Sequence, residues 1–517
     1  MKTPKVLIVF NTFLMVGFLL PLVYLFWRFF SFSGNILSLV ENWDVLTLLI
    51  NTISLFFTVV ISSVFLGISV AVLIFRYRVP FSRIILTMLI LPLVIPSYIG
   101  ALTYISMFSP KGLYVQIFSF LGIQEINGIG GFFGSWVVLT LFTFPYVLLI
   151  FGNGLSKLDS SIEEAARSLG VSGLSLYFKI VFPRLKKQII YSALLVGLYV
   201  ISDFGAVSLM RFRTITKAIY TYYEFNINGD PVIFYSVLII FLSLIISLVQ
   251  RGSTFSSSSK ISENFRTPVK KEMNYLLKFL SIIFLGLLIL FSLILPVSVL
   301  IYWITRGISL GNGLSLVFDG VLGSIAISGI TSMLAIVISI PIVVMLYQYK
   351  NNFSYLIERI LLTMYGLPHI AVGVSILFIS IKVFPSTYQS FPILVLSYLI
   401  VFLPQVIAGG QGSIEQVKVS YIDASMGLGK RKVETFFKVT LPIIYKGLFA
   451  GGALVFLSTM KELPQTLLLR PTGFSTMAVD IWSYASEGLF TQAAFSAFIM
   501  LAISAFPTYI LSTRNLT

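Results

Sequence analysis

The chain contains no cysteine, and its 517 residues include a single histidine. The lack of cysteine excludes disulfides and thiolate metal sites, and one histidine cannot by itself build a histidine-rich metal centre. Charge is also scarce, at 10% of residues, and the 19 acidic residues are outnumbered by 35 Lys and Arg. So few charges are not typical of a soluble globular protein and indicate a membrane protein.

Apolar residues dominate what remains. They make up 57% of the chain, and runs long enough to cross the hydrocarbon core recur throughout it. We therefore expect an all-α polytopic membrane protein with about twelve spans. The expected spans lie near residues 6–29, 47–75, 83–107, 132–153, 188–211, 231–250, 276–303, 320–347, 356–383, 390–412, 447–469 and 490–513. The first run is too long for a secretion signal and lacks a small-residue cleavage site, so we interpret it as a retained span.

Most of the basic residues fall on one side of this arrangement. If the N-terminus is cytoplasmic, the dense basic groups at 179–187 and 430–438 lie in cytoplasmic loops, and only Lys461 falls within a span. Cytoplasmic loops retain Lys and Arg, so both termini are predicted to be cytoplasmic. The net charge of +16 then needs no nucleic-acid partner.

The chain also repeats itself. The polar segment 251–275 is expected to be a cytoplasmic linker between a first repeat at 1–250 and a second at 276–517. The stretch EEAARSLGVSGLSLYFKIVFP aligns with IDASMGLGKRKVETFFKVTLP, which follows 259 residues later. Further matched pairs are Pro145 with Pro404, Asp203 with Glu462 and, after a slip in the alignment, Pro92 with Pro368. We therefore predict two parallel six-helix repeats.

Each repeat carries a polar loop between its fourth and fifth spans, at about 157–187 and 416–446. In the first loop, Ser160 and Ser161 each precede a Glu by three residues, which is the capping-box pattern. Gly170 stands where a left-handed residue would end this helix. A second helix is expected to end before a proline, at about residue 182. The pattern alone fits an interfacial amphipathic helix or a docking helix, and the duplication favours docking on a two-fold partner.

These duplicated motifs resemble the cytoplasmic loop of ATP-binding-cassette (ABC) importer permeases, in which Glu-Ala-Ala is followed after three residues by Gly and later by Pro. The resemblance implies a permease subunit with two fused halves in the bacterial cytoplasmic (inner) membrane. Each loop would be a coupling helix that enters a cleft on one of two copies of a cytoplasmic ABC ATPase subunit. The implied contacts are Glu164, Ala165, Ala166 and Gly170 in the first loop and Asp423, Ala424, Ser425 and Gly429 in the second.

The chain offers no convincing phosphate-binding loop of its own. The nearest match, ASMGLGKRK, has Ala424 where the first Gly belongs and Arg431 where Ser or Thr should follow the Lys. We therefore expect that this chain binds no cofactor and is no enzyme. ATP and Mg would bind to the partner ATPase subunit.

Four residues in the fifth spans of the two halves are candidates for a translocation pathway: Asp203, Lys461, Glu462 and Pro464. Ionisable residues inside a span are costly and indicate function, although a structural ion pair or snorkelling toward an interface would also explain them. A proline within a span would leave a carbonyl unpaired, and such breaks line cavities more often than lipid. His369 is interpreted as a packed, hydrogen-bonded residue, and no stable metal site is expected.

The runs SDFGAVSL and STMKELPQTLLLRPTGFSTMA resemble the fused permeases of ferric-iron importers. This resemblance implies ferric iron as cargo, delivered by an external substrate-binding protein. Related fused permeases serve thiamine, phosphonates or sugar phosphates, and these cargoes stay open. Arg211, Arg213 and Arg470, near the outer ends of these spans, could attract an anion or an acidic surface and are assigned to docking of the binding protein.

Two other classes of membrane protein are alternatives to an ABC importer permease. A secondary transporter can also have twelve helices in two parallel halves, but it would not need the duplicated loops. A membrane scaffold that transports nothing would leave the aligned intramembrane carboxylates without a role.

Overall fold

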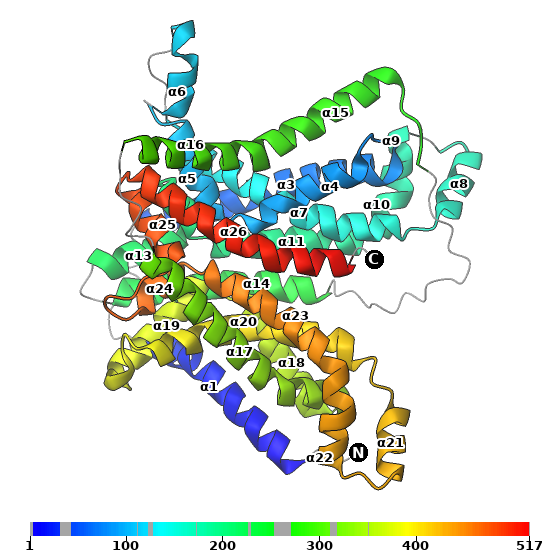
Figure 1. Ribbon diagram of the computed structural model, residues 1–517, viewed down its shortest axis with the longest axis vertical. Coiled ribbons are helices and arrows are strands. Elements are labelled where there is room, and N and C mark those ends of the chain that lie inside the picture. Colours follow the sequence, from blue (N-terminus) through cyan, green and yellow to red (C-terminus); the bar gives the residue numbers. More distant parts are fainter. Residues whose placement is uncertain are drawn as a thin grey trace.

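The computed structural model describes residues 4–31, 43–110, 112–122, 128–171, 173–225, 229–252, 270–310, 318–349 and 351–515. The regular elements in these ranges are helices, and one isolated parallel bridge joins Tyr77 to Lys271. Long helices run side by side in two lobes, which diverge toward the side of the molecule that carries α8 and α21 (Figure 1). That side is called the elbow face below, and the side that carries α13 and α25 is called the opposite face.

The two halves of the sequence contain matching sets of helices. The first half contains α1 (Lys5–Phe30), α3 (Trp43–Arg76), α4 (Ser82–Ile90), η1 (Leu91–Val94), α5 (Ser97–Met107), α6 (Leu113–Phe118), η2 (Ser119–Leu121), α7 (Gly131–Ser156), α8 (Ser160–Ser168), α9 (Gly173–Leu176), η3 (Tyr177–Val181), α10 (Phe182–Arg184), α11 (Lys186–Ser202), α12 (Gly205–Leu209), α13 (Ile215–Phe225) and α14 (Asp230–Gly252). The second half contains α15 (Tyr275–Ile289), η4 (Leu290–Ile294), α16 (Leu295–Ser309), α17 (Phe318–Gln348), α18 (Asn352–Tyr365), α19 (His369–Lys382), η6 (Pro385–Thr387), α20 (Phe391–Ile414), α21 (Val419–Gly427), α22 (Lys432–Thr435), η7 (Phe436–Thr440), α23 (Leu441–Met460), α24 (Pro464–Leu469), α25 (Met477–Ser486) and α26 (Phe490–Asn515).

The prediction of a polytopic membrane protein is confirmed. Within the described ranges, eight helices are long and apolar enough to cross a bilayer, and three more crossings are helix pairs bent at a short break. The last expected span corresponds to the shorter apolar stretch Phe490–Ala505 within α26. Together these elements account for the twelve expected spans.

The third span of each half is sharply bent at a proline. The helical segments on either side of the break meet at 97° in the first half and at 104° in the second. The proline directly before the second segment is Pro96 in one half and Pro368 in the other, both with extended backbone. A proline disfavours helical conformation at the preceding residue, which explains the break. Pairing Pro92 with Pro368 is therefore wrong in structural terms, because Pro92 lies earlier, inside η1.

Helical structure continues through three other prolines, each of which follows a π turn. The turns η3, η4 and η7 end two residues before Pro183, Pro296 and Pro442. A proline has no N–H to donate to the carbonyl four residues back, and its ring collides with that carbonyl. A π turn is wider than an α turn, so it moves that carbonyl away from the ring. The expected end of the helix before Pro183 is therefore wrong by two residues, since helical structure continues to Arg184 and the chain then bends by 77° before α11.

The first helix of each half packs on the other half. α1 lies against α17 and α19, and Asn11 Nδ2 contacts Met345 Sδ at 3.3 Å. In return, α15 and α16 lie along α4 and α5, and the hydroxyl of Tyr104 donates to the carbonyl of Phe291 at 2.9 Å. The two repeats are therefore interlocked through their first helices (Figure 1). Of the expected linker, residues 253–269 lie outside the described part of the chain.

Candidate functional site

The first polar loop folds into a compact pair of short helices, here named the first elbow (α8, α9, η3 and α10). Its opening helix is capped by Asp159, whose carboxylate accepts a hydrogen bond from the amide of Ser161 at 3.0 Å. The expected cap at Ser160 or Ser161 is wrong, because both residues are already helical. A carboxylate at this position suits the positive end of the helix dipole.

A left-handed glycine ends the opening helix of both elbows. Gly170 has φ +84°, and the amide of Val171 behind it donates to the carbonyl of Ala166 at 3.0 Å. In the second elbow (α21, α22 and η7), Gly429 has φ +80° and occupies the equivalent position. The left-handed residue expected at Gly170 is therefore confirmed, and the same turn is built twice.

Most of the residues implied to contact an ATPase lie at the surface of the elbows. The exposed ones are Glu164, Ala165, Gly170, Asp423, Ala424 and Gly429. Ala166 is buried, and Ser425 is half-buried with its hydroxyl 2.9 Å from that of Thr435. Two of the eight residues therefore hold the elbows together in this structure.

Each elbow also presents three exposed apolar side chains that match at the 259-residue offset. They are Leu169, Leu174 and Phe178 in the first elbow and Leu428, Val433 and Phe437 in the second, each between 59 and 83% exposed. These two sets are called the twin apolar knobs. Exposed apolar side chains that recur in equivalent positions indicate a surface prepared for a partner.

The first elbow is tied to the end of α3 by a buried ion pair that the sequence did not indicate. Arg76 Nη2 lies 2.7 Å from Glu163 Oε1, and the same guanidinium donates to the carbonyl of Leu155 at 3.0 Å. Both ion-pair side chains are at most 6% exposed. The second half has Ile422 at the position equivalent to Glu163, so this anchor occurs once. The partners are 87 residues apart in the sequence, and no local pattern connects them.

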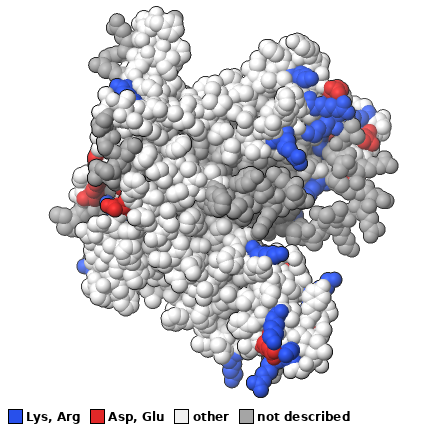
Figure 2. Space-filling view, in the orientation of Figure 1, with Lys and Arg blue, Asp and Glu red and all other residues white. Residues whose placement is uncertain are grey.

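A short stretch after the expected linker lies beside this anchor. Lys271 exchanges backbone hydrogen bonds of 2.9 Å with Arg76 and Arg78, and Arg78 forms an exposed ion pair with Glu272 at 2.6 Å. The segment leading into α15 is thereby attached to the base of the first elbow. Figure 2 shows Lys and Arg gathered on the elbow face of both lobes.

The two intramembrane carboxylates occupy equivalent places where a helix stops. Asp203 follows α11 and accepts hydrogen bonds from the Ser97 hydroxyl and from the amide of Ala206 at 3.0 Å. Glu462 follows α23, accepts from the amide of Gln465 at 3.2 Å and lies 2.6 Å from Nδ1 of His369. Each carboxylate is buried, and each joins the end of the elbow-bearing helix to the bent third span of its half.

This arrangement corrects the expected spans around the carboxylates. The fifth span of each half is interrupted at Asp203 and at Glu462, so neither residue lies in the middle of a continuous helix. Pro464 opens the short helix α24, where a missing N–H leaves no hydrogen bond unmade. Pro464 therefore does not lie inside a continuous helix, as the sequence suggested.

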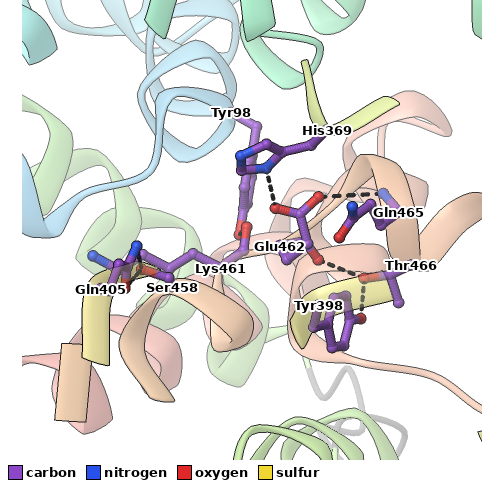
Figure 3. A network of polar contacts seen from close by, with 9 residues as sticks. All are labelled: Tyr98, His369, Tyr398, Gln405, Ser458, Lys461, Glu462, Gln465 and Thr466. Carbon is purple, nitrogen blue, oxygen red and sulfur yellow. Dashed lines mark hydrogen bonds and ion pairs between the residues drawn. The ribbon is translucent and has the colours of Figure 1, made fainter. Parts of the chain in front are cut away.

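The polar cluster around Glu462 joins both halves (Figure 3). His369 is packed edge-on against Phe402 and paired with Glu462, which confirms that it is a packed, hydrogen-bonded residue. The hydroxyl of Tyr98, from the first half, reaches the carbonyl of Lys461 at 3.4 Å. The side chain of Lys461 runs away from Glu462 toward Gln405 and Ser458. No group of three or more acidic or histidine residues suitable for a metal ion occurs within the described ranges.

The three arginines assigned to external docking lie on the opposite face. Arg211 is exposed with φ +56°, and Arg213 forms an ion pair with Asp44 at 3.1 Å. Burial, and then the proximity of Arg211 and Arg213, lower the pKa of Lys217 below its ordinary value, which shows that three cations gather here. Arg470, from the other half, donates to the carbonyl of Phe474 at 3.3 Å within its own loop.

Comparison with known proteins agrees with this architecture. Residues 63–254 match the family described as binding-protein-dependent transport system inner membrane component. The Fe(3+)-transport system permease protein FbpB 2 of Haemophilus influenzae is 28% identical over 90% of this chain and 89% of its own length. The sulfate transport system permease protein CysT of Salmonella typhimurium is 29% identical over 33% of this chain and 63% of its own length. The sulfate transport system permease protein CysW of Escherichia coli is 24% identical over 37% of this chain and 65% of its own length. The resemblance seen in the loop motifs is thus confirmed, and the chain is similar to binding-protein-dependent inner-membrane permeases.

Proposed function

We propose that the chain is the membrane subunit of an ABC importer. Two copies of a cytoplasmic ATPase subunit would bind the elbows, and ATP and Mg would be held by those subunits. An external substrate-binding protein would deliver the cargo to the opposite face, where Arg211, Arg213 and Arg470 would meet it. Ferric iron is the proposed cargo, and the elbow face together with both termini is placed in the cytoplasm.

The twin apolar knobs are the observation that carries this proposal. Three large side chains per elbow are exposed at positions that match one to one between the halves. Water would disfavour such surfaces unless a partner covered them. Two equivalent knobs on one chain call for a partner with two equivalent sockets, as a pair of identical ATPase subunits provides.

The helices offer a route by which elbow movement would reach the centre of the membrane. The second elbow continues through η7 into α23, which ends beside Glu462, and Glu462 holds the start of α19 through His369. In the first half, α11 leads to Asp203, which holds the start of α5 through Ser97. Bringing the elbows together would therefore move the bent third spans of both halves. This is a mechanical coupling between two rigid lobes.

Support for ferric iron as cargo comes from the relative that is similar along nine-tenths of the chain. Hard cations prefer carboxylate oxygens, which Asp203 and Glu462 could supply. In this structure both carboxylates are occupied by protein donors, so they would have to exchange those bonds for the cargo. The same importer class for thiamine, phosphonate or sugar phosphate is the alternative.

Uptake of labelled ferric iron by iron-starved cells tests this function. Cells lacking the protein would be compared with cells restored by the intact chain, by a Glu164→Lys/Asp423→Lys double variant, or by a Glu487→Lys control. Glu487 is exposed but lies outside both elbows. Rescue is expected from the intact chain and the control, with normal membrane levels of all forms and uptake near background for the double variant. Full uptake by the double variant, or loss of its uptake only in proportion to a lowered protein level, would contradict the coupling role.

A further inference from the structure

Lys461 is the charged residue of the polar cluster whose ammonium group has no partner. Within the described ranges, no ion pair or hydrogen bond engages its Nζ, although its backbone carbonyl is held by Tyr98. The neighbouring Glu462 is already paired with His369, and the Lys461 side chain points the other way (Figure 3). The residue is half-buried, so a small solute could still reach it.

A lone ammonium group inside a membrane span is costly, and it normally pairs with another group or serves a functional pathway. The C-terminal end of α23 favours a cation, but this dipole effect is small and does not replace a counter-ion. The first half has Ser202 at the equivalent position, at the end of α11, and reaches the same fold without a cation. The fold itself therefore does not require the charge of Lys461.

The groups beside the Lys461 side chain can also donate hydrogen bonds. Ser458 lies one helical turn before Lys461, whose amide donates to the Ser458 carbonyl at 3.2 Å, and in Figure 3 the Lys461 side chain runs toward Ser458 and Gln405. The side chains of Gln405 and Ser458 are hydrogen-bonded to each other at 3.0 Å, with either one as donor. The ammonium group attracts an oxyanion and repels a bare metal cation, and a carboxamide N–H and a hydroxyl can donate further hydrogen bonds to the same oxyanion. We propose that Lys461 anchors an oxyanion-binding subsite between the two halves, with Gln405 and Ser458 as further donors.

This inference rests on the proposed function in one respect: it treats the polar cluster around Glu462 as part of the translocation pathway. The oxyanion could be the cargo itself, or it could be a ligand that stays on the transported ferric ion. A cationic cargo such as thiamine does not fit this site, whereas a phosphonate or sugar phosphate does. Two of the relatives named above are sulfate permeases, so an oxyanion is compatible with this kind of chain.

Equilibrium binding of radiolabelled sulfate and phosphate to the purified full chain tests the subsite without the ATPase. We expect saturable binding of at least one anion, weakened at least about tenfold by Lys461→Met and largely kept by Lys461→Arg. Lys446→Met is the matched control, because Lys446 is an exposed lysine of the same helix, α23. Absence of saturable binding for both anions, or equal binding by Lys461→Met and the intact chain, would overturn the proposal.

A second measurement needs no variant and so does not depend on how Lys461→Met folds. The rate at which an amine-acylating reagent modifies Lys461 would be followed by peptide mass spectrometry. Phosphate or sulfate should slow modification of Lys461 and leave that of Lys446 unchanged. Equal rates at Lys461 with and without the anions would contradict the subsite.

Uptake of the labelled anion, with and without ferric salt, identifies the source of the oxyanion. Uptake that requires ferric salt indicates an anion carried on the metal, and uptake without it indicates an anion cargo. Anion binding that survives while ferric uptake is absent would refute ferric iron as cargo and leave the subsite intact. The failures of the two proposals are therefore distinguishable.

Discussion

Nδ1 of His369 lies 2.6 Å from Oε2 of Glu462, and this contact joins the bent third span of the second half to the end of its elbow-bearing helix. The first half makes the equivalent connection between Ser97 and Asp203. Both halves therefore connect the same two elements, but the partner of the carboxylate is a neutral hydroxyl in the first half and an imidazole in the second.

Removing the imidazole should destabilise the second half. His369→Leu leaves one oxygen of the buried Glu462 carboxylate without its side-chain partner, which should lower the free energy of unfolding by about 1–3 kcal/mol. His369→Gln keeps an N–H donor and should lose clearly less. Thermal unfolding of the purified variants in detergent measures the difference, and equal midpoints for Leu and Gln would show that packing, and not the hydrogen bond, is what matters.

The Arg76–Glu163 ion pair should be the main anchor of the first elbow. Arg76→Met leaves the buried Glu163 carboxylate with only its longer contact to Arg167, at 3.5 Å, and should cost up to about 3–5 kcal/mol. Arg78→Met is the control, because its pair with Glu272 is exposed and should contribute no more than about 1 kcal/mol. Denaturant unfolding, together with the rate of protease cleavage in the first elbow, reports both effects. Similar behaviour of the two variants would argue against a special role for the buried pair.

The left-handed glycines should resist replacement by alanine. Gly170→Ala and Gly429→Ala each force a side chain into a left-handed conformation, at a cost of about 1–2 kcal/mol. Gly427→Ala is the matched control, because a Cβ there meets nothing within 4 Å and its φ is not positive. Thermal unfolding and ferric uptake would be measured on all three. If Gly427→Ala lost as much stability as the other two, backbone strain could not be the reason.

Close helix crossing in the second half predicts a further sensitive position. A Cβ on Gly451 would lie 2.6 Å from the Cα of Val406, so that α20 and α23 would have to separate. Gly451→Ala should therefore destabilise by about 1–3 kcal/mol. Gly412→Ala, on the same helix pair but with nothing within 4 Å, should be neutral or slightly stabilising. The comparison uses thermal midpoints, and a neutral Gly451→Ala would show that the helices part easily.

Much of the fold could be predicted because its signals are local. Long apolar runs located the spans, and the repeated loop motif located both elbows, including the left-handed Gly170. The breaks within spans were placed less well. Pro464 and Pro183 look alike in the sequence, yet one opens a new helix and the other is passed through a π turn. Only the packing around each proline decides between these outcomes.

The sequence predicted the individual charged residues of the site but not their partners. Asp203 and Glu462 stood out as costly charges within spans, but their partners Ser97 and His369 come from the third span and follow prolines that the alignment did not pair correctly. The buried Arg76–Glu163 pair joins positions without any shared motif. Contacts between distant segments are set by the way the halves interlock, which no single stretch of sequence records.

The two elbows are proposed to be the binding sites for a pair of ATPase subunits. The most direct measurement is purification of the tagged chain from its native membrane, followed by mass determination of whatever remains bound. Two copies of one ATPase per chain are expected, retained by the Glu487→Lys control and lost with Glu164→Lys/Asp423→Lys. Purification of an intact, folded chain that transports cargo without any bound ATPase would contradict it and favour a secondary transporter.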